Sequence, residues 1–322
     1  MGSFRRELSQ TVRPRSRAEL LAAGVSRRTL TGRSWRPVAL GWHVPVDAAR
    51  TSTQRIVEAV TLVPEGCLSG WAAANVLGAD AFDGRDAFTG RLEDVRVVLP
   101  PSVSRVVARG VRCVRTELDE RDVSLRHGVR LTTPVRTAID LAREASNLVE
   151  AVVALDCLLR ARVLHPQQLG PLGTVRSLRG AAQVRRAASL ARVGVRSPWE
   201  TRLRLFALLD LRLPELVVNL PLFDLAGNFL GAPDLLDVEA GMALEFDGSG
   251  HRERAQHRSD NVREEGFERH GLVVVRADSL DLTQHRPELG RRIMAGRRDG
   301  LRNSAPRRWT TEAPPWWRGL PA

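Results

Sequence analysis

Residues 231–251, GAPDLLDVEAGMALEFDGSGH, constrain the fold more than any other stretch of the chain. Two apolar runs, residues 232–238 and 242–246, flank a Glu-Ala-Gly segment, and its glycine can supply the positive φ that a tight turn needs. The pattern predicts a β-hairpin.

Acidic residues gather at one end of this hairpin. Because side chains alternate along a strand, Glu245 and Asp247 share one face, and Leu244 and Phe246 cover the other. Asp234 lies at the same height on the first strand. Converging carboxylates repel one another unless a proton or cation is shared, and Mg²⁺ or Mn²⁺ suits such oxygen ligands. The spacing predicts a metal site, although a solvated acidic hairpin end fits it as well.

The composition favours a polyanionic partner. The chain has 322 residues, enough for two or three domains, a formal net charge of +12, and arginine at all 49 basic positions. Arginine forms bidentate contacts with phosphates and guanine edges, so DNA is the expected partner. The absence of lysine excludes a lysine Schiff base, a P-loop lysine and a lysine general base.

The cysteines and the N-terminal residues predict a cytoplasmic location. Cys67, Cys113 and Cys157 lie far apart without metal-site spacing, as buried thiols in a reducing compartment do. The first ten residues lack the apolar core of a signal peptide, and no apolar run has the length of a membrane span. We expect no membrane partner.

Residues 1–50 have the pattern of a winged helix-turn-helix unit. A Ser-x-x-Glu capping box begins one helix at Ser16, and Ser26 can cap a second. Residues 35–44 are aromatic and broken by proline and glycine, as a β-wing is. The second helix would present to the major groove Arg27, Arg28 and Arg33. A helical hairpin with a solvated arginine face is the alternative.

Residues 51–163 predict an α+β domain. The apolar patterns indicate helices over 54–62, 71–77 and 148–163, a helix that begins at Pro134, and strands over 95–99 and 111–114. Arg136, Asp140 and Arg143 form either a polar site or ion pairs within one helix, because their spacing is i, i+4 and i, i+3.

The first half of the chain resembles the antitoxins of abortive-infection type IV toxin-antitoxin systems. The resemblance rests on the order of the arginine helix, residues 35–44, Leu68-Ser-Gly-Trp-Ala-Ala-Ala and the TTPVRTAIDLAR stretch. It implies a winged helix that binds DNA for repression, and a nucleotidyltransferase-type toxin as a partner.

Residues 164–196 are predicted to be a basic linker and helix. The linker contains prolines and glycines, and a helix over 175–196 carries several arginines. Arg185 and Arg186 would either contact a phosphate backbone or form a solvated face.

Residues 197–298 predict an α/β domain. A helix begins with Ser197-Pro-Trp-Glu, and Glu200 is either a capping partner of Ser197 or a site residue, or both. Strands over 216–220 and 272–276 accompany the hairpin, and a polar helix over 254–269 precedes the last strand. This order is an α/β layering with the carboxylates at the sheet's edge.

This block resembles the PD-(D/E)xK nuclease superfamily, in the branch related to very-short-patch-repair endonucleases. The motifs are Pro233-Asp234, Glu245-Phe-Asp-Gly-x-x-His251, Asp260-x-x-Arg263 and Gly271-Leu-Val-Val-Val-Arg276. The resemblance implies a restriction-endonuclease-like fold with Asp234 and Glu245 as metal ligands and Glu200 as a further acid of the site. His251 would orient or deprotonate water, or protonate the leaving oxygen.

One departure from the superfamily concerns its lysine, which Asp247 replaces here. An acid cannot act as a cation beside the scissile phosphate, so His251 would take that part, or Asp247 would bind a second metal. Gln256, Asp260 and Arg263 share one helical face that either touches the site or packs beside it.

The expected protein is an α/β multidomain chain with a winged helix, a middle α+β domain, a nuclease-like domain and a disordered tail over residues 299–322. Its expected function is metal-dependent endonucleolytic cleavage of DNA. The alternative is a non-catalytic DNA-binding regulator of the antitoxin kind.

Overall fold

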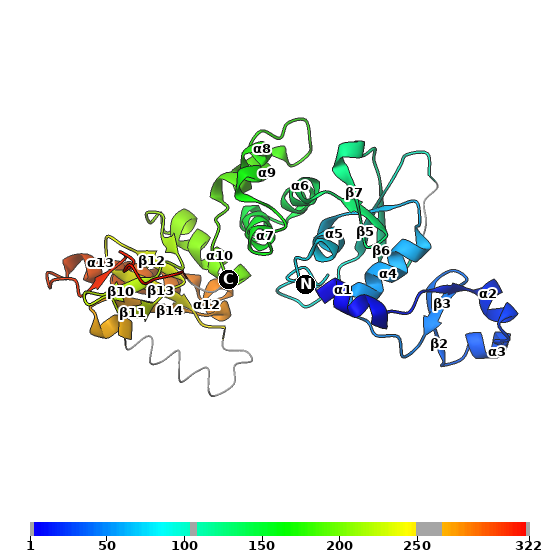
Figure 1. Cartoon of the computed structure of the whole chain (residues 1–322), viewed down its shortest axis with the longest axis horizontal. Helices are drawn as coiled ribbons and strands as arrows, with labels where there is room; N and C mark the ends of the chain where they lie inside the picture. The colour runs from blue at the N-terminus through cyan, green and yellow to red at the C-terminus, as the bar shows by residue number, and fades with distance from the viewer. Residues whose placement is uncertain (1–2, 104–107, 249–265, 320–322) are drawn as a thin grey trace. The chain divides into compact units, whose positions relative to one another are not determined.

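A computed structural model describes residues 3–103, 108–248 and 266–319 of the chain. The chain divides into two compact units, residues 1–191 and residues 192–322, and Figure 1 labels many of their elements. Each unit has its own buried core, so each is described by itself. No helix in the described ranges is long and apolar enough to cross a membrane.

The first unit begins with short helices and a three-stranded sheet of order β1-β3-β2. Its elements are α1 (Ser3–Glu7), a 3₁₀ turn (Leu8–Gln10), β1 (Arg15–Ser16), α2 (Arg17–Ala22), α3 (Arg27–Leu30), β2 (Trp35–Ala39) and β3 (Trp42–Pro45). The predicted caps are confirmed, because Ser16 forms a capping box with Glu19 and the Ser26 side chain accepts the Thr29 N–H. The predicted second helix is wrong at its end: α3 stops at Leu30, and Arg33 lies in the following turn.

The middle of the first unit is a five-stranded sheet of order β6-β5-β4-β8-β7. Its elements are α4 (Ser52–Leu62), β4 (Cys67–Leu68), α5 (Gly70–Leu77), β5 (Val95–Leu99), β6 (Val111–Arg115), a 3₁₀ turn (Glu120–Asp122), β7 (Val123–Arg126) and β8 (Val129–Thr132). The predicted helices and strands of this region are confirmed within a few residues. The sequence did not predict β4, β7 and β8, which have only two to four residues each.

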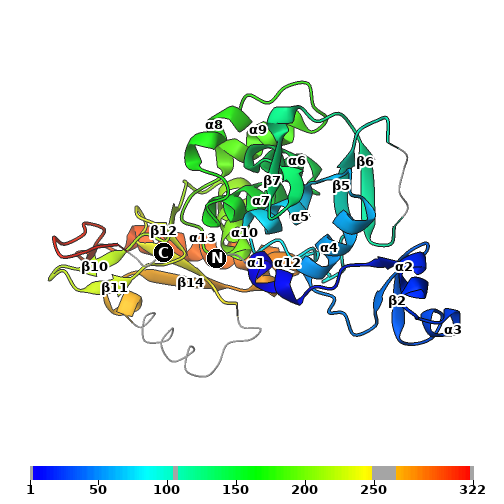
Figure 2. The same cartoon turned by 45° about the vertical axis from the view of Figure 1, so that its right-hand side comes forward.

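A helical layer completes the first unit (Figure 2). It contains α6 (Pro134–Glu144), α7 (Leu148–Arg160), a 3₁₀ turn (Pro166–Gln168), α8 (Leu169–Leu172) and α9 (Ala181–Leu190). Helix α9 contacts both α6 and α7 and buries Val184 and Ala187. The predicted basic helix over 175–196 is therefore shorter than expected, and it packs as a part of this unit.

The polar residues of α6 form a buried ion cluster. Asp140 is fully buried, and its carboxylate lies 3.3 Å from Nε of Arg136 and 3.0 Å from Nε of Arg143. It also accepts a 2.8 Å hydrogen bond from Ser69 Oγ, and Arg96 lies 3.8 Å away. The ion-pair interpretation of this spacing is confirmed, and its partners include residues from outside the helix.

The second unit is built on a four-stranded sheet of order β14-β13-β12-β9. Its elements are α10 (Pro198–Leu205), a π-helical turn (Phe206–Asp210), β9 (Val217–Val218), β10 (Leu222–Asp224), β11 (Phe229–Gly231), β12 (Leu235–Asp237), β13 (Met242–Phe246), β14 (Val273–Ala277), α12 (Ser279–Thr283), α13 (Arg286–Arg302) and β15 (Trp309–Thr310). The hairpin is confirmed: β12 and β13 are antiparallel, and Leu235 is paired with Leu244. Strand β14 joins β13 in parallel.

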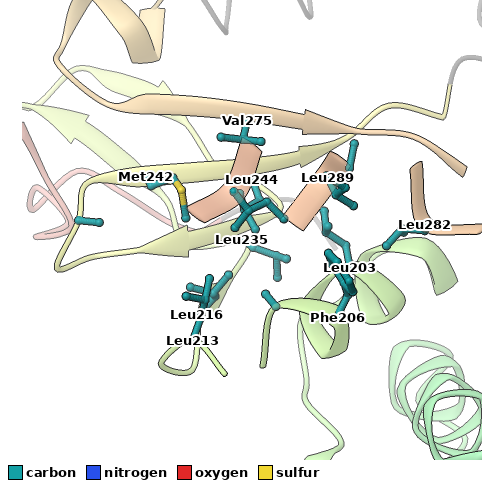
Figure 3. Close-up of a cluster of buried hydrophobic side chains, with 14 residues drawn as sticks. Leu203, Phe206, Leu213, Leu216, Leu235, Met242, Leu244, Val275, Leu282 and Leu289 are labelled. Carbon is teal, nitrogen blue, oxygen red and sulfur yellow. The ribbon is translucent and has the colours of Figure 1, made fainter. Parts of the chain in front are cut away.

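Both faces of this sheet are covered. On one face, Leu235, Leu244 and Val275 pack against Leu203 of α10 and Leu289 of α13, as Figure 3 shows. On the other face, Leu236 and Ala243 belong to a second core with Phe267 and Trp309, where the small sheet β11-β10-β15 lies. Because β12 and β13 are inner strands, the carboxylates lie at the ends of inner strands and not on an edge strand.

The predicted disordered tail is wrong for the described residues up to 319. Helix α13 extends to Arg302, and β15 pairs with β10. The ring of Trp317 stacks on Phe229, with centroids 4.8 Å apart. Apolar burial of the aromatic residues orders a segment whose proline and arginine content indicates disorder.

Candidate active site

Asp234 and Glu245 meet at one end of the hairpin. Leu235 is paired with Leu244 in the antiparallel hairpin. Asp234 precedes Leu235 and Glu245 follows Leu244, so the two acids lie opposite each other, one position beyond this pair. The Asp234 carboxylate reaches across the hairpin, because the Phe246 N–H donates a 2.8 Å hydrogen bond to its Oδ2. The predicted shared height of the two acids is confirmed.

The two acids also share one face of the sheet. Asp234 is two residues before Leu236, Glu245 is two residues after Ala243, and both apolar residues belong to the same core. Side chains two residues apart along a strand point to the same side. Leu244 and Phe246 face the opposite core, as predicted. The Oε1 atom of Glu245 is shielded from solvent.

Asp247 lies two residues after Glu245, directly after the end of β13. Its N–H donates a 2.7 Å hydrogen bond to the Ala277 carbonyl, which extends the parallel pairing of β13 and β14 by one position. Asp247 is half-buried, and its place after Phe246 puts it on the side of Glu245. Asp247 therefore lies at the same end of the sheet as Glu245.

Glu200 is held inside the unit by its own hydrogen bonds. The Ser197 side chain caps α10 by accepting the Glu200 N–H at 3.2 Å, as predicted. The Glu200 side chain is 5% exposed, and its Oε2 accepts 2.9 Å hydrogen bonds from the Arg196 N–H and from Nδ2 of Asn219. Its carboxylate thus secures the start of α10 and a neighbouring loop.

Asn219 is a positioning residue that sequence reasoning missed. It is buried, with φ of +47°, a left-handed conformation that asparagine tolerates better than most residues. Its side chain donates to Glu200 and to the Gly194 carbonyl, and its own N–H donates a 3.1 Å hydrogen bond to the Asp234 carbonyl. Asn219 therefore connects Glu200 to the backbone of Asp234. In the sequence, the feature that could have indicated this positioning role is a single asparagine directly after two valines.

An aromatic stack holds α10 against the end of β13. The rings of Trp199 and Phe246 are nearly parallel, with centroids 5.3 Å apart. The guanidinium of Arg202 lies 4.6 Å from the centroid of Trp199 on the same helix. Stacking and cation–π attraction at this distance stabilise the arrangement. Phe246 directly follows Glu245, so the stack also fixes the backbone that carries this acid.

Asp234 and Glu245 are the carboxylates that could hold a metal ion at this end of the sheet. Among the described residues, no group of three or more His, Cys, Asp or Glu is arranged to hold one. Mg²⁺ needs only one or two carboxylates, because it keeps several waters and takes substrate phosphate oxygens. Asp234 and Glu245 fit this requirement by number and position, although Asp234 also accepts the Phe246 N–H. Glu200 uses one oxygen in two internal hydrogen bonds. His251, Gln256, Asp260 and Arg263 lie outside the described residues.

The arginines predicted to bind DNA differ in their exposure. Arg27, Arg28 and Arg33 are all exposed at the N-terminal helices and turn. Arg186 is exposed on α9, but Arg185 is half-buried and donates a 2.8 Å hydrogen bond to the Val175 carbonyl. Arg185 therefore has a structural contact within the first unit.

Comparison with the solved structures finds a similar protein of low sequence identity. No protein-family model and no curated protein matches the chain. A crystal structure of the Rv2827c protein from Mycobacterium tuberculosis is similar over 67% of this chain and 82% of that one, with 16% sequence identity and a TM-score of 0.37.

Proposed function

We propose that the protein binds DNA and hydrolyses phosphodiester bonds with a divalent metal ion held by Asp234 and Glu245. The observation that carries the proposal is the strand register, which puts these two acids at neighbouring positions on one face of the sheet. The resemblance of the same residues to the PD-(D/E)xK superfamily supports it. Either Mg²⁺ or Mn²⁺ suits two carboxylates and water.

The proposed reaction is the addition of water across a phosphodiester. The water oxygen forms a bond to phosphorus, the bond from phosphorus to one bridging oxygen breaks, and the departing oxygen gains a proton. When bound, the metal ion supplies Lewis acidity and lowers the pKa of a coordinated water. Asp234 and Glu245 would hold it, while the Phe246 N–H and Asn219 fix Asp234.

DNA binding in this proposal belongs to the N-terminal helices and the arginine surface. The order β1-α2-α3-β2-β3 and the sheet order β1-β3-β2 are compatible with a winged helix-turn-helix. Exposed Arg27, Arg28 and Arg33 would contact phosphates, and no base-specific contact is proposed. The logarithm of the binding constant falls with the logarithm of the salt concentration, and each lost phosphate contact makes this negative slope shallower by about 0.9. Arg28→Ala should show this change in fluorescence anisotropy.

The nuclease proposal is tested by incubating the full chain with supercoiled plasmid and Mg²⁺. Asp234→Asn and Glu245→Gln should abolish nicking, because each removes one charged ligand. Glu239→Gln is the matched control, since Glu239 is an exposed acid at the opposite end of the same hairpin. Equal nicking by all four proteins, or none by the wild type, would contradict the proposal.

A second candidate is a DNA-binding regulator of the antitoxin kind without catalysis. It is favoured by Asp247 in place of the superfamily's lysine and by the internal hydrogen bonds of Glu200. This candidate predicts salt-dependent binding to its own promoter, no heat of Mg²⁺ binding and no cleavage. Co-purification with a nucleotidyltransferase-type toxin would support it further.

A further inference from the structure

We infer that the Arg276 guanidinium contacts the scissile phosphate. Arg276 would thereby supply the positive charge that the segment carrying Glu245 and Asp247 does not provide. The inference rests on the proposed nuclease function and assigns one more residue to that site. No lysine exists anywhere in the chain, so any cation in this role must be an arginine, a histidine or a metal ion.

The strand register places Arg276 beside Glu245. Strands β13 and β14 are parallel, and Glu245 is paired directly with Arg276. Asp234 lies on the other side of Glu245 across the hairpin. The three residues therefore form a row across neighbouring strands, at the end of the sheet where β13 and β14 terminate and β12 begins.

Arg276 points to the same side of the sheet as the two acids. Val274, two residues earlier, packs with Ala243 and Leu236, whereas Val275 and Ala277 belong to the opposite core. By alternation, the Arg276 side chain is on the face of Glu245 and Asp234. Arg276 is solvent-exposed, so a large ligand can approach it.

The backbone of Arg276 is fixed from the opposite side. Arg292 on α13 donates a 2.9 Å hydrogen bond to the Arg276 carbonyl and forms a 2.6 Å ion pair with Asp281. Together with the pairing to β13, this contact holds the strand end in place. A fixed backbone limits the positions that the guanidinium can reach, which is the requirement for a preorganised phosphate contact.

The chemistry of arginine defines what Arg276 can do. A guanidinium presents a planar set of donors that matches two phosphate oxygens, and it stays charged at every accessible pH. It can therefore stabilise the negative charge that develops on the phosphoryl oxygens, but it cannot act as a general acid or base. Its charge also opposes the binding of a cation at the neighbouring carboxylates.

The test compares Arg276→Gln and Arg276→Lys with the wild type and with Arg298→Gln, a control at an exposed arginine of α13. Arg276→Gln should lower kcat for plasmid cleavage about 10² to 10³-fold at every pH without moving the pH profile, and Arg276→Lys should restore part of the loss. Calorimetry should show that Arg276→Gln binds Mg²⁺ several-fold more tightly, because a neighbouring positive charge is gone. Arg298→Gln should match the wild type in both measurements.

The outcomes separate the two proposals. If the wild type cleaves DNA and Arg276→Gln cleaves at the same rate, the role of Arg276 is overturned and the nuclease function stands. A moved pH profile, or unchanged Mg²⁺ affinity in Arg276→Gln, would also overturn it. If the wild type neither cleaves DNA nor binds Mg²⁺, the proposed function falls, and the role of Arg276 falls with it.

Discussion

Replacement of Glu200 tests whether this acid has a structural role or belongs to a metal-binding cluster of carboxylates. The two roles predict changes of opposite sign in the free energy of unfolding. In Glu200→Ala, the Arg196 N–H and Nδ2 of Asn219 lose their acceptor inside a buried region. Each hydrogen bond to a charged group contributes about 1.5–3 kcal/mol, so the loss of two should lower the free energy of unfolding by about 3–6 kcal/mol. Glu200→Gln keeps an acceptor oxygen and loses only the charge, so about 1–2 kcal/mol is expected.

The opposite result is expected if Glu200 mainly belongs to a cluster of repelling carboxylates. Removing one of several like charges would then stabilise the protein in the absence of metal. The assay is urea unfolding of the full chain without divalent ions, followed by hydrogen exchange of peptides from residues 197–246, so that the second unit is measured separately. Increased stability of Glu200→Ala in this assay would refute the structural role assigned to Glu200.

Three further predictions concern the packing of both units. Asp140→Asn removes the fully buried charge from beside Arg96, Arg136 and Arg143, and it should destabilise the first unit by about 3–5 kcal/mol in urea unfolding. Gly300→Ala would place a Cβ 2.2 Å from the Ala240 carbonyl oxygen and should cost about 1–3 kcal/mol, whereas Gly170→Ala, with open space around it, should not lower the melting temperature. Burial raises the pKa of the Cys67 thiol to about 11 from the ordinary 9.0, so native Cys67 should resist alkylation at pH 8 until the chain is unfolded. The Cys67 thiol ionises at lower pH in the unfolded chain than in the folded one, so the free energy of unfolding should fall as the pH rises from about 9 to 11. Unfolding experiments over this pH range should show that Cys67→Ala lacks this fall.

Local sequence signals determined many of the elements. Ser16, Ser26 and Ser197 mark the starts of helices because a side-chain oxygen can satisfy a nearby N–H without help from distant residues. The hairpin also follows from local rules, since its strands are separated by a short turn with Gly241 at φ of +60°. Its alternation then determines that Asp234 and Glu245 meet on one side.

Tertiary structure decided what the remaining residues do. The burial of Glu200 under Asn219 joins residues 19 positions apart, and no periodicity signals such a contact. The pairing of Arg276 with Glu245 depends on a parallel strand that follows a long connection. The order of the tail depends on Trp317 stacking on Phe229, almost ninety residues earlier. Short-range patterns fix local geometry through the backbone, whereas these contacts depend on packing between distant segments, which only the folded chain specifies.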